Sequence, residues 1–228
     1  MISVIVPVRT IPSKFAQLRE RILSATQPIE ILYILRKDLE EQIPSLGNRE
    51  RLLIARRIGR GHAMMQGALE STGDTLLFLH ADTLLPERWD SLLVTALSEA
   101  GIVGGGFRLR FDKENMYLKF LVVLSTLLFR LTGELWGDRA LFVRSEALRQ
   151  CSPAIDVPIM EDVRLSHCMK TRGRVILLDA AVRTASDAFH RRGMLRHTMR
   201  ILLCRSLYTL GVPLELIWRC YYGRSTTQ

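Results

Sequence analysis

Strand-like and helix-like segments alternate through the first hundred residues of this chain. Short uncharged runs rich in β-branched residues predict buried strands, and apolar residues at helical spacing predict amphipathic helices. The expected elements are a strand over 2–8, a helix over 13–25, a strand over 29–35, a weaker strand over 52–55, a helix over 59–71, a strand over 75–79 and a helix over 86–99. Such alternation predicts an α/β fold with a mainly parallel central sheet flanked by helices on both faces. Ligands bind such sheets beyond the carboxyl ends of the strands.

The second half of the chain does not keep this regular alternation of strands and helices. Its expected elements are a strand over 101–111, a long apolar helix over 115–131, a short strand over 140–143, a helix over 161–171, a strand over 175–178 and helical segments from 190 to 222, broken near 211–213. We therefore expect one α/β domain over residues 1–189. A basic helical C-terminal extension over residues 190–228 is expected to pack on that domain or on a membrane surface.

Size, composition and cysteine pattern exclude several classes of protein. The 228 residues, 48% apolar and 24% charged, suit one folded domain and exclude disorder of the whole chain. The longest uncharged apolar run, 120–129, is shorter than the roughly 20 residues of a membrane span. The apolar start of the chain lacks a basic segment and makes a poor signal peptide. The four cysteines form no C-x-x-C pair and indicate a reducing compartment, so we expect a cytoplasmic protein.

The net charge of +9 is carried mainly by arginine, which supplies 27 of the 32 basic residues. Arginine favours bidentate contact with phosphate and carboxylate groups, so nucleic acid, anionic lipid and phosphorylated small molecules are all admissible partners. A basic, well-solvated surface explains the charge equally well. The aromatic content of 7% and the lack of a known binding motif argue against nucleic acid.

The C-terminal segment concentrates this charge. Residues 183–228 contain eight arginines against two acidic residues, a net charge of +6. Leucines and methionines alternate with the arginines between 194 and 207, as in a basic amphipathic helix that lies on an anionic membrane. The alternative is a helix that packs on the domain with its arginines in solvent. Attachment to the inner face of the membrane is therefore one hypothesis.

Two segments place acidic residues where they can do chemistry. A buried strand leads to His80 and Asp82, which are both of a type that binds divalent cations, and a metal there would bridge phosphate oxygens. The alternative is that Asp82 caps the next helix or closes a turn. Glu161 and Asp162 begin a predicted helix. One of these carboxylates could act as a general base. The alternative is that both acids only stabilise the helix by interacting with its dipole.

Two further segments carry weaker signals. Asp138 follows Gly137 just before a short strand, which places it at the rim of a site or in an ordinary turn. Arg60 stands between Gly59 and Gly61 at a helix start, where backbone N–H groups and a guanidinium suit a phosphate. Glycine pairs are also common before helices without any ligand.

Taken together and in this order, these segments resemble the family 2 glycosyltransferases of the GT-A fold. The resemblance is closest to a short bacterial branch that carries Leu-His-Ala-Asp-Thr where most relatives have Asp-x-Asp. The matching segments are 2–7, 59–61, 67–68, 73–74, 77–83, 104–105, 107–111, 137–138, 141–144, 158–162 and 191–193. They span about 190 residues, nearly the whole chain.

The resemblance implies inverting transfer of a hexosyl group from a nucleotide-sugar donor to an unknown acceptor, with lipid-linked acceptors among the candidates. Asp82 matches the residue that binds Mg²⁺ or Mn²⁺ on the donor diphosphate. Asp162 matches the acid that deprotonates the acceptor hydroxyl, and Glu161 lies beside it. The residues expected to contact the donor are Pro7, Arg60, His80, Asp82 and Asp138.

The sequence departs from the family pattern in its nucleotide-binding half. Arg9 and Thr10 stand where relatives usually have Asn-Glu, and residues 35–41 contain no glycine where relatives have an Asp- and Gly-rich loop. Ala63 and Met65 replace the branch's usual Gln and Asn. These departures leave two alternatives beside the enzyme: a non-catalytic relative that binds nucleotide or a partner, and a basic membrane-surface module. A nucleotidyltransferase is disfavoured because residues 8–13 contain no glycine.

Overall fold

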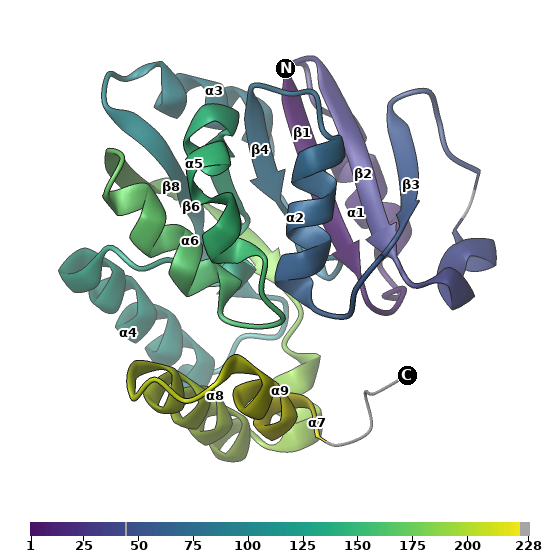
Figure 1. Cartoon of the computed structure of the whole chain (residues 1–228). Helices are drawn as coiled ribbons and strands as arrows, with labels where there is room; N and C mark the ends of the chain where they lie inside the picture. Colours follow the sequence, from purple (N-terminus) through teal and green to yellow (C-terminus); the bar gives the residue numbers. More distant parts are fainter. Residues whose placement is uncertain (44, 224–228) are drawn as a thin grey trace.

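An eight-stranded sheet lies between two layers of helices, and a further group of helices packs beneath it (Figure 1). The computed structural model describes residues 1–43 and 45–223. The strands are β1 (Ile2–Val8), β2 (Ile29–Leu35), β3 (Glu50–Ile54), β4 (Thr75–Phe78), β5 (Thr83–Leu84), β6 (Ile102–Phe111), β7 (Leu141–Arg144) and β8 (Arg174–Thr184). Their order across the sheet is β3-β2-β1-β4-β7-β6-β8-β5.

The helical elements follow the strands in the order that the alternation predicts, with additions in the second half. They are α1 (Phe15–Leu23), η1 (Lys37–Gln42), α2 (Arg60–Glu70), α3 (Trp89–Ser98), α4 (Met116–Thr132), η2 (Gly137–Arg139), α5 (Ser145–Ile155), α6 (Glu161–Lys170), α7 (Asp187–Arg192), α8 (Met194–Thr209) and α9 (Leu214–Tyr222). Within the described residues, no helix is long and apolar enough to cross a bilayer.

The α/β prediction is confirmed, but the sheet is mixed. Strands β1 to β4 pair in parallel, whereas β7 is antiparallel to both β4 and β6, and β5 is antiparallel to β8. Strand β7 follows α4 and η2, which lie beyond the carboxyl end of β6. The chain therefore re-enters the sheet from that edge without a crossover, and an antiparallel strand results.

Each face of the sheet carries its own hydrophobic core. One face packs against α1 and α3, where Phe15, Ile22 and Trp89 are buried. The other face packs against α2, α5 and α6, where Met64, Leu148 and others are buried. Because both faces are covered, the strands of the parallel half are buried at nearly every residue, as parallel strands generally are.

Several expected details differ from the structure. Helix α3 begins at Trp89 rather than near Pro86, because Arg88 adopts a left-handed conformation (φ 54°) that a helix cannot continue through. Strand β8 is much longer than expected because it pairs along β6. Helix α5 was not anticipated. The cysteine pattern indicated a reducing compartment, whereas the packing of α5 on α6 joins Cys151 and Cys168 in a disulfide.

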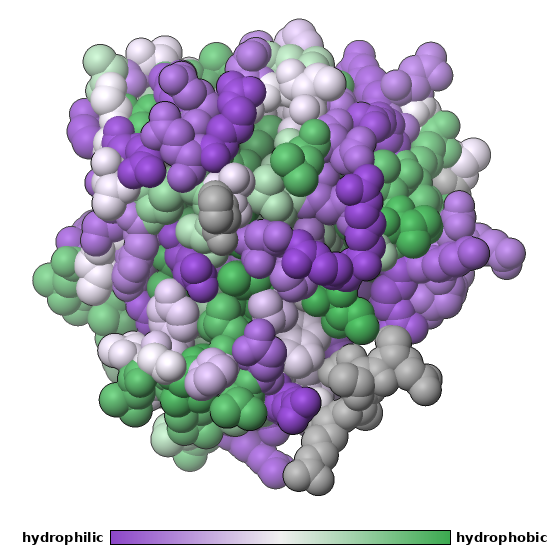
Figure 2. All heavy atoms as spheres, viewed as in Figure 1, coloured by the Kyte–Doolittle hydropathy of each residue, from purple (hydrophilic) through white to green (hydrophobic). Residues whose placement is uncertain are grey.

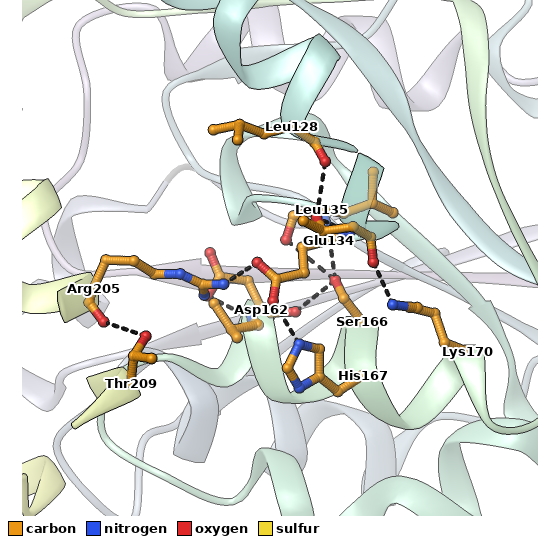
Figure 3. Close-up of polar contacts among 11 residues, drawn as sticks. Leu128, Glu134, Leu135, Asp162, Ser166, His167, Lys170, Arg205 and Thr209 are labelled. Atoms are coloured by element: carbon orange, nitrogen blue, oxygen red, sulfur yellow. Dashed lines mark hydrogen bonds and ion pairs between the residues drawn. The ribbon is translucent and has the colours of Figure 1, made fainter. Parts of the chain in front are cut away.

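The C-terminal helices dock beneath the sheet beside α4 (Figure 1). The Tyr117 hydroxyl of α4 lies 2.9 Å from the Thr198 hydroxyl of α8. The loop after α4 contributes Glu134, whose carboxylate accepts hydrogen bonds from both His167 of α6 and Arg205 of α8 (Figure 3). The expected boundary at residues 189/190 falls inside α7.

Candidate active site

Four of the predicted site residues line one small cavity beyond the carboxyl ends of β1 and β4. Pro7 comes from β1, Arg60 from the first turn of α2, His80 from the segment after β4 and Asp162 from the first turn of α6. The free space among them is about 10 Å³, roughly enough for one water molecule. The structure thus brings together, at one edge of the sheet, segments that are far apart in the sequence.

Arg60 is the centre of this group. Its Nε donates to the Glu161 carboxylate, its NH1 group donates to His80 Nε2, and its NH2 group lies 3.4 Å from Asp162 Oδ2. Burial opposes the charged guanidinium, but the charges of Glu161 and Asp162 outweigh it and raise the pKa of Arg60. Burial and then the Arg60 charge hold the pKa of His80 well below its usual range. The site therefore contains a fixed cation beside a neutral imidazole whose Nε2 is an acceptor.

The glycines on either side of Arg60 have a packing role. Gly59 has φ +133°, and a Cβ there would lie 2.6 Å from Pro158 Cα. A Cβ on Gly61 would lie 2.3 Å from the Val157 carbonyl oxygen. Helix α2 can approach the loop before α6 only because both positions lack a side chain. This close approach accounts for the Gly-Arg-Gly motif without a bound phosphate.

The two acids at the start of α6 occupy different environments. The Glu161 side chain is buried, its Oε2 has no hydrogen-bond partner among the described residues, and burial raises its pKa. The Asp162 side chain is half-buried, and its Oδ2 accepts a 2.7 Å hydrogen bond from the Gly137 N–H. Of the two, Asp162 is the one placed to meet a ligand, and Glu161 holds Arg60.

Helix α6 is fastened to the segment before η2 beneath these acids (Figure 3). The Ser166 hydroxyl donates to the Asp162 carbonyl oxygen at 2.8 Å and accepts from the Leu135 N–H at 3.0 Å. Ser166 and Leu135 are fully buried. Asp162 is therefore held through its carbonyl oxygen by Ser166 and through its carboxylate by the Gly137 N–H of η2.

Asp82 lies at the exposed end of the segment that follows β4. Its neighbour Thr83 is buried and anchors the segment through a 2.9 Å hydrogen bond to the Thr184 hydroxyl at the end of β8. The Asp82 carboxylate receives only a 3.4 Å hydrogen bond from Thr83 among the described residues. It does not cap α3, which begins seven residues later. Surrounding protein raises its pKa through desolvation, and the nearby charge of Arg60 partly offsets that effect.

Asp138 belongs to η2 and points toward the same group of charges. Its Oδ1 is buried and has no hydrogen-bond partner within the described part of the chain. Burial raises its pKa, the charge of Arg139 opposes this, and the charge of Asp162 adds to it. Asp138 thus lies near Asp162 and Arg60 but does not line the small cavity.

The residues at this site could hold a metal ion that arrives bound to a substrate. They do not form the complete ligand set of a permanently bound metal ion. No group of three or more metal-binding side chains gathers anywhere in residues 1–43 and 45–223. Mg²⁺ commonly uses one or two carboxylates and takes its other ligands from phosphates and water. The free, exposed carboxylate of Asp82 meets that requirement, and His80 is already engaged by Arg60.

Two further residues lie near the site: Arg9, which stands where relatives usually have Asn-Glu, and Tyr222, which no sequence pattern indicates. The Arg9 guanidinium lies 4.3 Å from the centre of the Tyr222 ring, which belongs to α9. Burial raises the pKa of Tyr222, which also senses the charges of Arg60 and Glu161. The last helix therefore returns to the neighbourhood of Arg60 and Glu161. No local pattern predicts this contact, because the partners lie at opposite ends of the chain.

Comparisons with solved structures give the same fold. PcManGT, a mannosyltransferase from Pyrobaculum calidifontis in complex with GDP-Man and Mn²⁺, superposes with a TM-score of 0.66 at 19% identity, over 99% of this chain and 70% of that one. S. aureus TarS 1–349 in complex with UDP-GlcNAc gives a TM-score of 0.59 at 14% identity, over 81% of this chain and 58% of that one. A mycobacterial protein superposes with a TM-score of 0.58 at 16% identity, over 93% of this chain and 76% of that one.

Sequence comparison assigns the family. No curated protein matches the chain. The family model for glycosyl transferase family 2 matches residues 3–151, which include most of β1, all of α2 and β4, and both Asp82 and Asp138. Because that match covers more than half of the chain and the solved neighbours share the GT-A fold, the chain belongs to glycosyl transferase family 2.

Proposed function

We propose that the protein moves a hexosyl group from a nucleotide-sugar donor to an acceptor hydroxyl, with inversion and with the help of a divalent metal. The observation that carries this proposal is that Arg60 and Asp162 line one cavity at the carboxyl edge of β1 and β4, where sheets of this class bind ligands, and that Asp82 lies near enough for the Arg60 charge to act on it. They supply a proton acceptor, a fixed cation and a free carboxylate. The neighbours solved with GDP-Man and UDP-GlcNAc support a nucleotide-sugar donor.

The proposed reaction is a single displacement. The acceptor oxygen forms a bond to the anomeric carbon, the bond from that carbon to the diphosphate oxygen breaks, and its electron pair leaves with the nucleoside diphosphate. The acceptor proton passes to the Asp162 carboxylate, acting as general base. The hydrogen bond from the Gly137 N–H fixes the direction of that carboxylate.

The leaving group gains negative charge as the bond breaks, and the site offers a cation to meet it. Arg60 is held in place by buried Glu161, and preorganised donors of this kind stabilise charge that develops in a transition state. Mg²⁺ or Mn²⁺ bound at Asp82 would neutralise the diphosphate further. Pro7, His80 and Asp138 complete the proposed donor side of the site.

A second candidate function is nucleotide binding without turnover. Its support is the very small free space around Arg60, together with Arg9 and Tyr222 above it. On this alternative, Arg60 stays bound to Glu161 and His80, and no sugar enters.

Calorimetric titration with a panel of nucleoside diphosphates, with and without Mn²⁺ or Mg²⁺, tests both candidates. The enzyme predicts metal-dependent binding of one nucleotide and release of that diphosphate from its sugar derivatives. Binding without any release of diphosphate supports the second candidate and contradicts the first. Absence of binding across the panel contradicts both.

We also propose peripheral attachment to an anionic membrane at the inner, cytoplasmic face. The supporting observation is a row of exposed apolar side chains on the neighbouring helices α4 and α8, visible as green atoms at the lower left of Figure 2. These side chains are Met116, Phe120, Val123, Leu127, Leu131, Leu195, Met199, Leu202 and Leu203. Apolar rows beside basic residues suit the interface of an anionic bilayer.

A further inference from the structure

A second cavity, of about 280 Å³, lies along α7 and α8 and is lined only by basic and imidazole side chains. The lining residues are Arg191, Arg192, Arg196, His197 and Arg200. The Arg-Arg-Gly segment that precedes α8 thus contributes two of the five. The proposed transfer reaction, as described above, uses none of them.

The four guanidinium groups have no acidic partners. None of them lies within 4.0 Å of a carboxylate in residues 1–43 and 45–223. Other arginines of this protein do pair with acids, as Arg19 does with Glu50 and Arg108 with Asp179. Like charges gathered around a cavity repel one another, and a bound anion would relieve that repulsion.

His197 gives an independent indication of a ligand. Its side chain is 4% exposed, yet its Nδ1 has no hydrogen-bond partner among the described residues. The ring is held edge-on against Phe189, with 4.6 Å between the ring centres. Burial, followed by the charges of Arg192 and Arg200, lowers the pKa of His197. His197 is one of the residues that line the cavity, and buried polar atoms are normally hydrogen-bonded. In the tautomer that carries the proton on Nδ1, this nitrogen could donate to an anion.

The cavity adjoins the proposed active site through α9. Arg192 lies 6.0 Å from the centre of the Tyr221 ring, and Tyr221 packs on Tyr222 with 4.8 Å between ring centres. Burial raises the pKa of Tyr221, while Arg60 and Arg192 both lower it, so this ring lies within reach of both charges. The two tyrosines therefore separate the cationic cavity from Arg60.

We propose that this cavity binds a phosphate or diphosphate group carried by the acceptor. Several arginines around one space match a multiply charged phosphate, which accepts bidentate hydrogen bonds from each guanidinium. The assignment to the acceptor rests on the proposed function. The donor diphosphate is already assigned to Arg60 and Asp82, on the other side of Tyr221 and Tyr222. The acceptor hydroxyl would then reach Asp162 from the α9 side.

Titration with inorganic pyrophosphate in EDTA and 150 mM NaCl tests the cavity without any turnover. We expect binding to the wild type and at least a tenfold weaker Kd in Arg196→Gln/Arg200→Gln. Arg219→Gln should bind as the wild type does, since Arg219 is an exposed arginine of α9 outside the cavity. No binding to the wild type, or equal loss in Arg219→Gln, overturns the proposal.

The double variant removes like charges that repel each other, so its melting temperature without anion should equal or exceed that of the wild type. If it fails to fold, the single variant Arg196→Gln, at an exposed position, gives the same comparison. Failure of the proposed transfer reaction would leave these pyrophosphate affinities unchanged, so the two failures are distinguishable.

A competition arm separates a water-soluble from a lipid-borne phosphate. Glycerol 3-phosphate and vesicles containing phosphatidic acid both present a phosphate monoester, and vesicles of phosphatidylglycerol match the charge without one. Displacement of pyrophosphate by glycerol 3-phosphate indicates a soluble acceptor, and displacement by phosphatidic acid vesicles alone indicates a lipid. Equal displacement by phosphatidylglycerol vesicles shows charge attraction only and overturns the proposal.

Discussion

Arg60 and Glu161 form an ion pair across 101 positions of sequence and join the first turns of α2 and α6. The pair is possible because Gly61 lets the two segments approach closely. It also orders the site, since Arg60 reaches His80 and Asp162 from the same position. Glu161 is therefore best understood as the residue that positions Arg60.

Glu161→Gln should destabilise the fold. The amide keeps the shape but leaves the Arg60 charge with only the longer contact to Asp162, and loss of a charged hydrogen bond costs about 1–3 kcal/mol. Urea unfolding at pH 7 measures the loss. Asp179→Asn, which removes an exposed ion pair with Arg108, should change stability by less than about 0.5 kcal/mol. Equal effects of the two substitutions would contradict the positioning role.

Asp162→Asn should lower turnover by roughly 10² to 10⁴, the usual contribution of a positioned base. The amide can still accept the hydrogen bond from the Gly137 N–H, so the local structure should survive. Donor and metal affinities should change little, because Asp82 carries those contacts. Wild-type turnover in this variant, with a donor and acceptor established, would rule out the assignment. Loss of donor binding would instead place Asp162 in the donor site, with Asp138 as the next candidate base.

Asp82→Asn should abolish the stabilisation that nucleoside diphosphate and Mn²⁺ give together. A ligand present at 100 times its Kd adds about 2.7 kcal/mol to stability, which a thermal-shift assay detects. Without ligand the variant should be as stable as the wild type or more so, because desolvation disfavours the ionised Asp82 carboxylate. A metal-dependent shift of the wild-type size in the variant would show that Asp82 does not hold the ion.

Asp112→Asn should reduce stability in a pH-dependent way. Burial opposes the charged carboxylate, but hydrogen bonds from Ser186 and Lys14 outweigh it and lower the pKa of Asp112 from 3.8 to about 2. A depressed pKa in the folded state stabilises the protein above the unfolded value, here by about 2 kcal/mol. That stability is lost as the pH falls from about 4 through about 2. The difference between variant and wild type should therefore be largest near pH 7.

Urea unfolding at several pH values measures this difference. Asp187→Asn is the control, because Asp187 is exposed and makes only a 3.5 Å contact with Lys113. A difference between Asp112→Asn and the wild type that stays constant down to pH 2 would show that the ionised carboxylate is not its source.

The apolar row on α4 and α8 should bind vesicles that contain anionic lipid at low salt. Phe120→Ser/Leu127→Ser removes two exposed members of that row and should reduce co-sedimentation. Leu69→Ser changes an equally exposed leucine on α2 and should not. Equal recovery with neutral and anionic vesicles would contradict the proposed electrostatic attachment.

The sequence was sufficient for the alternating strands and helices and for the site segments at their ends. Local periodicity encodes each of these elements, and alternating strands and helices favour a parallel sheet whose carboxyl ends share one edge, where the structure places Pro7, Arg60 and His80. The sequence did not predict the reversed direction of β7, the disulfide between Cys151 and Cys168, or the stacking of Arg9 on Tyr222. Each of these depends on how α4 to α9 close around the sheet. Contacts between distant segments leave no periodic trace in either one, because the free energy that selects them arises only when both surfaces are packed together.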